Sequence, residues 1–159
     1  MLSISRPVSG PVRRDCWGDG AFGAPRGGRL HRGLDLVAEP GQLVLAPVHG
    51  RIVRWGWCYP DDPEYRLAVI QAADAPMLVR LLYVRPAVRA GTDVTPEDTI
   101  GLVQDLRRRY PAGARHPEPI TPHVHLEVAL LDGAALVGRG TDPDRRIWIN
   151  PALLLEDGS

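Results

Sequence analysis

The stretch PHVHLE, residues 122–127, decides the fold of this chain of 159 residues. It places His123 and His125 two positions apart. Side chains at i and i+2 lie on the same face of a β-strand, whereas on a helix they diverge by about 200°. The stretch therefore predicts a strand that presents both imidazole rings on one side.

A second stretch, RLHRGLD at residues 29–35, offers His31 and Asp35 four positions apart. On an extended strand their Cβ atoms would be roughly 13 Å apart, at about 3.3 Å per residue, which is too far to share an ion. Gly33 lies between them and permits a bend that brings both side chains onto one ion. A further ligand must then come from another part of the chain.

Imidazole nitrogen and carboxylate oxygen are ligands of borderline divalent metals, above all zinc, and a catalytic zinc site has three protein ligands and one open position. Side chains at the spacing of His123 and His125 lie about 7 Å apart on a strand. One of them can bind the ion while the other lies beside it as a general acid or base. A lone histidine is usually a structural or surface group, but two compact clusters that contain three of the five histidines favour a metal site.

Composition is that of a soluble globular protein, with 44% hydrophobic and 24% charged residues. Nineteen basic residues balance nineteen acidic ones, so bulk charge gives no reason to expect a polyanionic partner. Every basic residue is an arginine, which excludes Schiff-base chemistry and a lysine general base.

Short β-branched or aliphatic runs between turn residues predict strands at residues 42–46, 51–57, 66–71, 77–85, 99–103 and 123–131. Residues 47–50 predict a tight hairpin connection between the first two strands. No long segment has apolar residues at helical spacing, and only residues 104–110 and 151–155 favour short helices. The predicted fold class is mainly β, an antiparallel sheet or sandwich with few short helices.

Glycine and proline are frequent near the beginning of the chain, which predicts an irregular arm over residues 1–20. We expect Trp17 to anchor this arm, and we expect a single domain over residues 21–159. Cys16 and Cys58 permit at most one disulfide, and neither belongs to a C-x-x-C pair.

These stretches resemble the LytM-type zinc metallopeptidases of the M23 (lysostaphin-like) family. The similarity begins near FG at residues 22–23, includes both histidine stretches and residues 42–53, and ends at WINP, residues 148–151. It implies an antiparallel β fold with a substrate groove and one zinc ion per chain. It also implies hydrolysis of peptide bonds in bacterial peptidoglycan, in the stem peptide or the cross-bridge.

The resemblance implies that His31, Asp35 and His125 bind the zinc ion and that His123 is the catalytic histidine. In this interpretation His123 helps to deprotonate and align the attacking water. Glu127 follows on the same face of the strand, and we expect it to orient His125 or His123.

The sequence departs from the family at one segment. Active members have a second active-site histidine in a Tyr-x-His-Leu segment, and the corresponding residues 83–86 read YVRP here. Arg85 would then stabilise the developing oxyanion, or His116 or His49 would enter the groove from another loop. A third interpretation is a catalytically silent domain that binds peptidoglycan, regulates, or forms part of a phage tail. All three metal ligands are retained, which favours an enzyme.

Partners and location follow from weaker signals. Three consecutive arginines at 107–109 before Tyr110 resemble a nucleic-acid patch, but such runs are more often solvated, and we expect no nucleic acid. The N-terminus lacks a signal-peptide pattern, and no run approaches the roughly 18 apolar residues of a membrane span. We therefore expect synthesis in the cytoplasm and action at the wall after lysis, after delivery by a phage or tail-like particle, or through an unrecognised export route.

Overall fold

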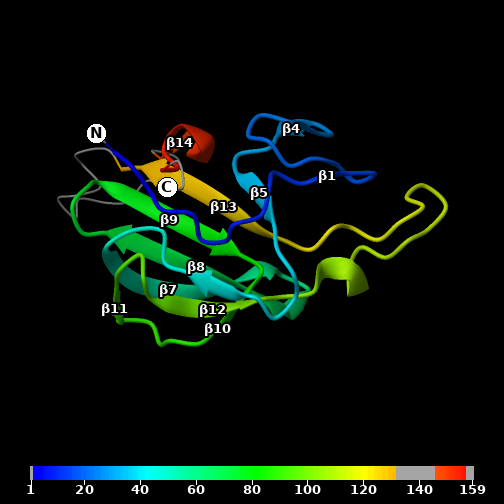
Figure 1. Cartoon of the computed structure of the whole chain (residues 1–159). Helices are drawn as coiled ribbons and strands as arrows, with labels where there is room; N and C mark the ends of the chain where they lie inside the picture. Colours follow the sequence, from blue (N-terminus) through cyan, green and yellow to red (C-terminus); the bar gives the residue numbers. More distant parts are fainter. Residues whose placement is uncertain (1, 132–145, 157–159) are drawn as a thin grey trace.

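A seven-stranded antiparallel sheet dominates the computed structural model, which describes residues 2–131 and 146–156 (Figure 1). Six strands follow one another across this sheet, in the order β11 (Asp93–Val94), β7 (Gly50–Tyr59), β8 (Asp62–Ala72), β9 (Met77–Leu82), β13 (His123–Leu130) and β14 (Ile147–Ile149). The seventh strand, β5 (Leu34–Val37), also pairs with β13. The predicted fold class is confirmed: the structure is nearly all β.

Three smaller sheets complete the fold. One consists of β10 (Val84–Pro86), β12 (Thr99–Val103) and β6 (Leu43–Leu45), and two hairpins consist of β1 (Arg14–Asp15) with β2 (Gly18–Asp19) and β3 (Pro25–Arg26) with β4 (Arg29–Leu30). The helices in the described part of the chain are single 3-10 turns, η1 (Leu106–Arg108) and η3 (Pro151–Leu153).

The predicted hairpin between residues 42–46 and 51–57 is wrong. β6 pairs with β12 instead, and β7 pairs with β8 around a turn at Pro60 and Asp61. The connecting residues explain the difference, because Ala46 and Val48 are buried rather than exposed at a surface turn. The segment therefore carries the chain from one sheet to another through the core.

The core lies where the large sheet and the three-stranded sheet face each other. Fully buried side chains on both contribute to it, among them Val44, Ile52, Ile70, Val79, Ile100 and Val124. The N-terminal arm joins the same core through Ile4, which is 1% exposed and forms a parallel bridge with Leu155. The first residues thus support the domain instead of lying beside it.

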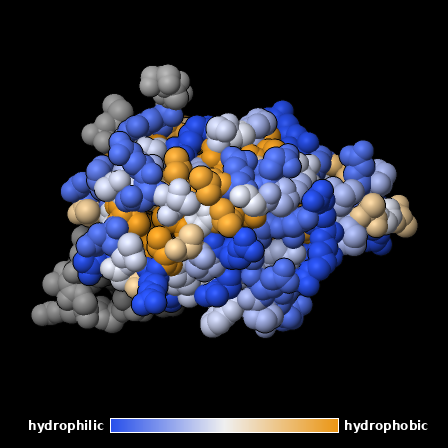
Figure 2. Space-filling view, turned by 60° about the horizontal axis from the view of Figure 1, so that its bottom comes forward, coloured by the Kyte–Doolittle hydropathy of each residue, from blue (hydrophilic) through white to orange (hydrophobic). Residues whose placement is uncertain are grey.

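Hydrophilic side chains cover most of the face that carries β10 to β12, and apolar side chains gather near its middle (Figure 2).

The three consecutive arginines are all paired with acidic side chains: Arg107 with Asp105, Arg108 with Asp62 and Glu64, and Arg109 with Asp61. No helix in the described ranges is both long enough and apolar enough to cross a membrane.

Candidate metal centre and active site

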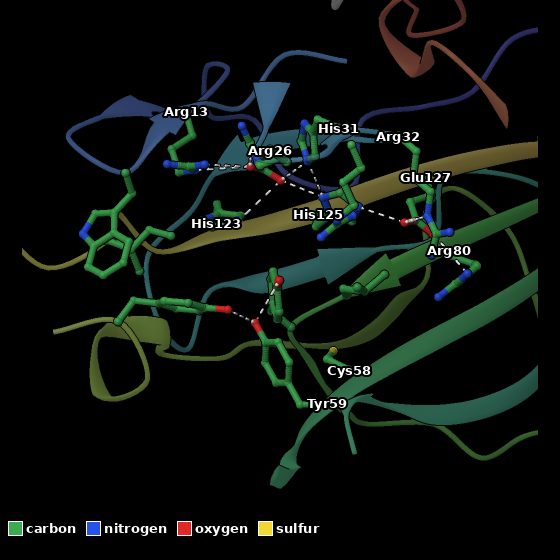
Figure 3. A pocket seen from close by; sticks show the side chains of 17 residues that line it. Arg13, Arg26, His31, Arg32, Cys58, Tyr59, Arg80, His123, His125 and Glu127 are labelled. Atoms are coloured by element: carbon green, nitrogen blue, oxygen red, sulfur yellow. Dashed lines mark hydrogen bonds and ion pairs between the residues drawn. The ribbon is translucent and has the colours of Figure 1, made fainter. Parts of the chain in front are cut away.

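A cavity of about 360 Å³ contains both histidine stretches (Figure 3). The ligand wall, formed by β13, β5 and the residues just before β5, carries His31, Asp35, His123 and His125. The tyrosine wall opposite it carries Tyr59, Tyr83 and Tyr110. Arginines from the N-terminal arm, the β3–β4 hairpin and β9 complete the lining, namely Arg13, Arg26, Arg29, Arg32 and Arg80.

Strand register brings the predicted ligands together. β13 and β5 are antiparallel neighbours, and His125 is directly opposite Asp35. Asp35 Oδ1 lies 2.7 Å from His125 Nδ1 and 3.3 Å from His31 Nε2. His31 Nε2 lies 3.0 Å from His125 Nδ1. Ligand atoms from these three residues all lie within 4.8 Å of one another.

The hydrogen bonds on the outer side of each ring show which nitrogen faces inward as an electron-pair donor. His31 Nδ1 donates to the carbonyl oxygen of Ala21 at 2.9 Å, and His125 Nε2 donates to Glu127 Oε1 at 3.1 Å. In these tautomers His31 Nε2 and His125 Nδ1 both present lone pairs, as does Asp35 Oδ1. Electron pairs this close repel one another unless a cation lies among them, so the donor set fits a divalent metal.

Gly33 is required for space. A Cβ atom at this position would lie 2.6 Å from Cε1 and Nε2 of His125 and 2.7 Å from the carbonyl oxygen of Leu126. The sequence suggested that the glycine permits a bend, and the chain does bend here. Its backbone, however, is not in the left-handed region. The absence of a side chain is what lets the first stretch approach the His125 ring.

Two arginines that the sequence did not single out hold the other oxygen of Asp35. Arg13 is buried and donates to Asp35 Oδ2 from Nε at 3.3 Å and from Nη2 at 3.0 Å, and Arg26 Nη2 lies 3.5 Å away. Burial would raise the pKa of Asp35, but its contacts with His125 and His31 outweigh burial and hold this pKa well below its usual range. The carboxylate is therefore charged and fixed.

Glu127 has a comparable setting behind His125. Its Oε1 accepts from Arg32 Nε at 2.9 Å as well as from His125, and its Oε2 lies 3.3 Å from Arg80 Nη1. Burial opposes the charge of Glu127, but the hydrogen bond from His125, the charge of Arg80 and the hydrogen bond from Arg32 lower its pKa to about 2. Both guanidinium groups also face the ring of Trp148, at 4.6 and 5.6 Å from its centroid. A charged Glu127 fixes the tautomer of His125.

His123 is placed to accept a proton. Its Nδ1 donates to the carbonyl oxygen of Thr121 at 2.7 Å, so the lone pair is on Nε2, which faces Asp35 Oδ1 at 3.7 Å. Burial lowers the pKa of His123 to about 4, so the ring is neutral at pH 7. A neutral imidazole with an inward lone pair has the properties of a general base.

The other candidates from the sequence lie outside the cavity. Arg85 is exposed on β10 and borders a separate hollow near Glu64. His116 stacks on Trp17 with ring centroids 3.6 Å apart and donates from Nδ1 to the carbonyl oxygen of Cys16. Its ring supports Trp17, which does line the cavity. His49 is exposed and borders a third hollow.

The sequence pointed to Tyr83, which begins the segment YVRP, and to Tyr110, which follows the three arginines, but it assigned no role to their hydroxyl groups. The Tyr59 hydroxyl lies 3.1 Å from that of Tyr83 and 2.8 Å from that of Tyr110, and the Tyr83 ring meets the His123 ring edge to face at 5.3 Å. Burial raises the pKa of Tyr59 and of Tyr83, so both remain protonated. Cys58 also lines the cavity, and both cysteines of the chain are unpaired.

Comparison with known proteins gives one family. The sequence model of peptidase family M23 matches residues 29–137. Leukocyte cell-derived chemotaxin-2 of Mus musculus is 27% identical over 113 residues, which cover 71% of this chain and 69% of that protein.

Solved structures show the same fold. Csd3 of Helicobacter pylori has a TM-score of 0.64 at 17% identity, over 99% of this chain and 36% of Csd3. The solution structure of lysostaphin has a TM-score of 0.60 at 19% identity, over 89% of this chain and 52% of that one. The chain thus spans between a third and about half the length of these two proteins.

Proposed function

The chain belongs to peptidase family M23, and from this we propose that its cavity is a zinc-dependent endopeptidase site that hydrolyses peptide bonds of bacterial peptidoglycan. One observation carries the proposal. Three electron-pair donors converge at 2.7 to 3.3 Å, beside a neutral histidine whose free nitrogen faces them. The name of lysostaphin of Staphylococcus simulans, an antimicrobial peptidase of the same fold, is consistent with a wall substrate.

His31 Nε2, Asp35 Oδ1 and His125 Nδ1 are the atoms that would hold the ion. Three protein ligands are the usual number in catalytic zinc sites, in which a further position takes water or substrate. When bound, zinc supplies a Lewis acid that polarises the scissile carbonyl and makes water more acidic. Two imidazoles and one carboxylate suit zinc better than magnesium or calcium, which prefer oxygen ligands.

The protein's own residues supply the proton path. His123 Nε2 takes the proton of the attacking water as the new C–O bond forms, and the same proton can pass to the leaving amine as the C–N bond breaks. The Thr121 carbonyl oxygen holds His123 in the tautomer that this requires. Glu127 does the same for His125, and Arg13 orients Asp35.

A second candidate is a silent module that binds its metal and a wall or particle component without turnover. Two observations favour it. A curated relative is named as a chemotaxin instead of a peptidase, and the segment at residues 83–86 lacks the histidine of active members. Delivery by a phage particle stays a prediction from the sequence.

Digestion of purified walls tests the two candidates. We expect the zinc-loaded wild type to release peptide amino groups, and we expect a chelator to abolish the release. His123→Ala should lower the rate about 10²- to 10⁴-fold, the usual contribution of a general base, while it keeps one zinc per chain by elemental analysis. His49→Ala and Arg85→Ala should keep the wild-type rate, because both residues lie outside the cavity.

Other results would contradict the proposal. Full activity of His123→Ala would exclude His123 as the base. Wall binding without release in every variant, at full zinc loading and on walls of several cross-bridge types, would favour the silent module.

A further inference from the structure

We propose that Tyr83 is the hydrogen-bond donor to the carbonyl oxygen of the scissile peptide. This inference rests on the proposed function, because it concerns the same cavity and the same reaction. In peptide hydrolysis negative charge develops on that oxygen, and a fixed donor aimed at it stabilises the transition state.

The backbone of Tyr83 is held in a conformation that turns its side chain into the cavity. Its φ is 71°, and it is the only non-glycine residue with positive φ in the described chain. It separates β9 from β10, where the chain passes from the large sheet to the small one. Consecutive residues on a strand face opposite sides, yet here Leu82 and Tyr83 both line the cavity.

Neighbouring strands maintain this conformation. The Tyr83 amide donates to the carbonyl oxygen of Arg66 at 2.9 Å, and the Tyr83 carbonyl oxygen accepts from the Gln104 amide at 2.9 Å. A bulky residue with positive φ is strained and persists only where the surroundings fix it, which is frequent at functional sites. The strain is therefore a sign that the position of the Tyr83 ring matters.

Counting protons identifies Tyr83 as the donor with a free O–H. Tyr59 donates its single hydroxyl proton to the Tyr83 oxygen at 3.1 Å. The 2.8 Å contact between Tyr59 and Tyr110 must then use the proton of Tyr110. Two bonds consume two of three protons, and the remaining one is on Tyr83, for which the described residues provide no acceptor.

This arrangement also strengthens the Tyr83 donor. A hydroxyl group that accepts a hydrogen bond is polarised and donates more strongly. Tyr110 polarises Tyr59, and Tyr59 polarises Tyr83. Tyr59 lies across the cavity from His123 and His125 (Figure 3). The Tyr83 ring meets the His123 ring edge to face at 5.3 Å, so the series of hydroxyls ends at a residue that contacts the ligand wall.

The other donors in the lining are engaged elsewhere. Arg13 and Arg26 contact Asp35, Arg32 and Arg80 contact Glu127, and Trp17 donates to the carbonyl oxygen of Glu118. Arg29 is exposed on β4, at the rim. Arg85, which the sequence suggested for this role, borders a different hollow. Tyr83 is thus the half-buried, uncommitted donor whose ring contacts the ligand wall at His123.

Tyr83→Phe tests the inference, because it removes the hydroxyl and keeps the ring. We expect kcat on a wall-derived peptide to fall about 10²- to 10³-fold, as for loss of one oxyanion donor, with KM changed by less than about threefold. Tyr59→Phe should cost less, about tenfold, because it removes only the polarisation of Tyr83. Tyr65→Phe is the matched control, since the Tyr65 hydroxyl donates to the carbonyl oxygen of Asp105 outside the cavity.

A second measurement does not depend on turnover. A phosphinic peptide carries a tetrahedral, charged centre in place of the scissile amide, and zinc-loaded Tyr83→Phe should bind it about 10²-fold more weakly than Tyr65→Phe does. Equal kcat and equal phosphinic-peptide affinity in these two variants would overturn the inference, with wild-type activity still supporting the proposed function. If the wild type releases nothing, the proposed function fails, and the phosphinic-peptide comparison alone decides whether Tyr83 donates.

Discussion

The two walls of the cavity differ in how the chain assembles them. On the ligand wall, His125 and Asp35 are cross-strand neighbours, and His123 and His31 lie two and four positions from them in sequence. On the tyrosine wall, Tyr59, Tyr83 and Tyr110 come from three separate segments and meet through their hydroxyl groups and their rings. The first wall depends on register and the second on packing.

This difference separates metal binding from the handling of substrate. Register fixes the ligand atoms even if the opposite wall shifts, because strand pairing is a backbone property. The tyrosine wall depends instead on a small cluster of Tyr65, Leu106 and Ile120, apart from the main core. Substitutions on the ligand wall should therefore change zinc affinity, whereas substitutions on the tyrosine wall or behind it should leave zinc affinity unchanged.

The largest effect is expected on the ligand wall. Asp35→Asn keeps the shape of the side chain but removes the charge that Arg13 and Arg26 balance. Zinc affinity, measured by competition with a chromogenic chelator, should fall at least about 100-fold, since loss of outer partners alone costs 10- to 100-fold. Tyr110→Phe on the opposite wall should stay within about twofold of wild type. A similar loss in both variants would show that the walls are coupled.

The next largest effect concerns the packing of the tyrosine wall. Leu106 is fully buried, and Leu106→Ala should lower the free energy of unfolding by about 2–5 kcal/mol in urea. Zinc affinity should not change, because His31, Asp35 and His125 are not members of this cluster. Leu153→Ala, at a side chain that is 81% exposed, should change stability by less than about 0.5 kcal/mol. A parallel loss of zinc from Leu106→Ala would argue against separate walls.

A smaller effect is expected where the ligand wall is crowded. Gly33→Ala places a methyl group 2.6 Å from the His125 ring, which must shift. We expect a cost of about 1–3 kcal/mol, as for overpacking, together with weaker zinc binding. Gly28→Ala is the matched control, because a Cβ atom there meets nothing within 4 Å. Equal melting temperatures for the two variants would contradict the steric explanation.

The smallest effect concerns the N-terminal arm. Asp15 accepts from the amides of Trp17 and Thr121, both at 2.9 Å. Burial would raise the pKa of Asp15, but these hydrogen bonds and the charge of Arg13 lower it. At neutral pH, Asp15→Asn should cost about 1 kcal/mol of unfolding free energy.

The pH dependence of this difference has a definite sign. A carboxylate with a lowered folded pKa stabilises the protein above its unfolded pKa of about 3.9, and this contribution is lost as pH falls through the folded value. Denaturation series at pH 7 and near pH 3 should therefore show the gap between wild type and Asp15→Asn closing in acid. A gap of constant size would mean that the carboxylate charge contributes nothing.

The sequence was most informative about the strands, because runs of β-branched and aliphatic residues between turn residues predict them locally. Each predicted strand overlaps a strand of the structure, and β12 matches its predicted residues 99–103. Strand pairing was harder to predict. The partner of β6 depends on the burial of residues 46–48, and the alternation of apolar and polar residues does not show whether a connecting segment is buried. The run at 77–85 likewise divides at Tyr83, where the chain changes sheets.

The candidate site shows the same limit. His31, Asp35, His123 and His125 could be singled out because two short stretches contain all of them. Arg13 and Tyr59 could not, since nothing in their neighbouring residues distinguishes them from other arginines and tyrosines. Contacts between segments that lie far apart in the sequence can be identified only once the strand pairing is known.

One edge of β13 has a further consequence for its dynamics. β5 pairs with residues 123–126 and β14 pairs with residues 128–130, so two unconnected segments share this edge and meet at Glu127. Amide hydrogens on either side of such a junction can exchange through separate local openings. We expect the amides around His123 and His125 to stay protected while those facing β14 exchange faster. β14 can then fray without releasing the residues of the candidate metal centre.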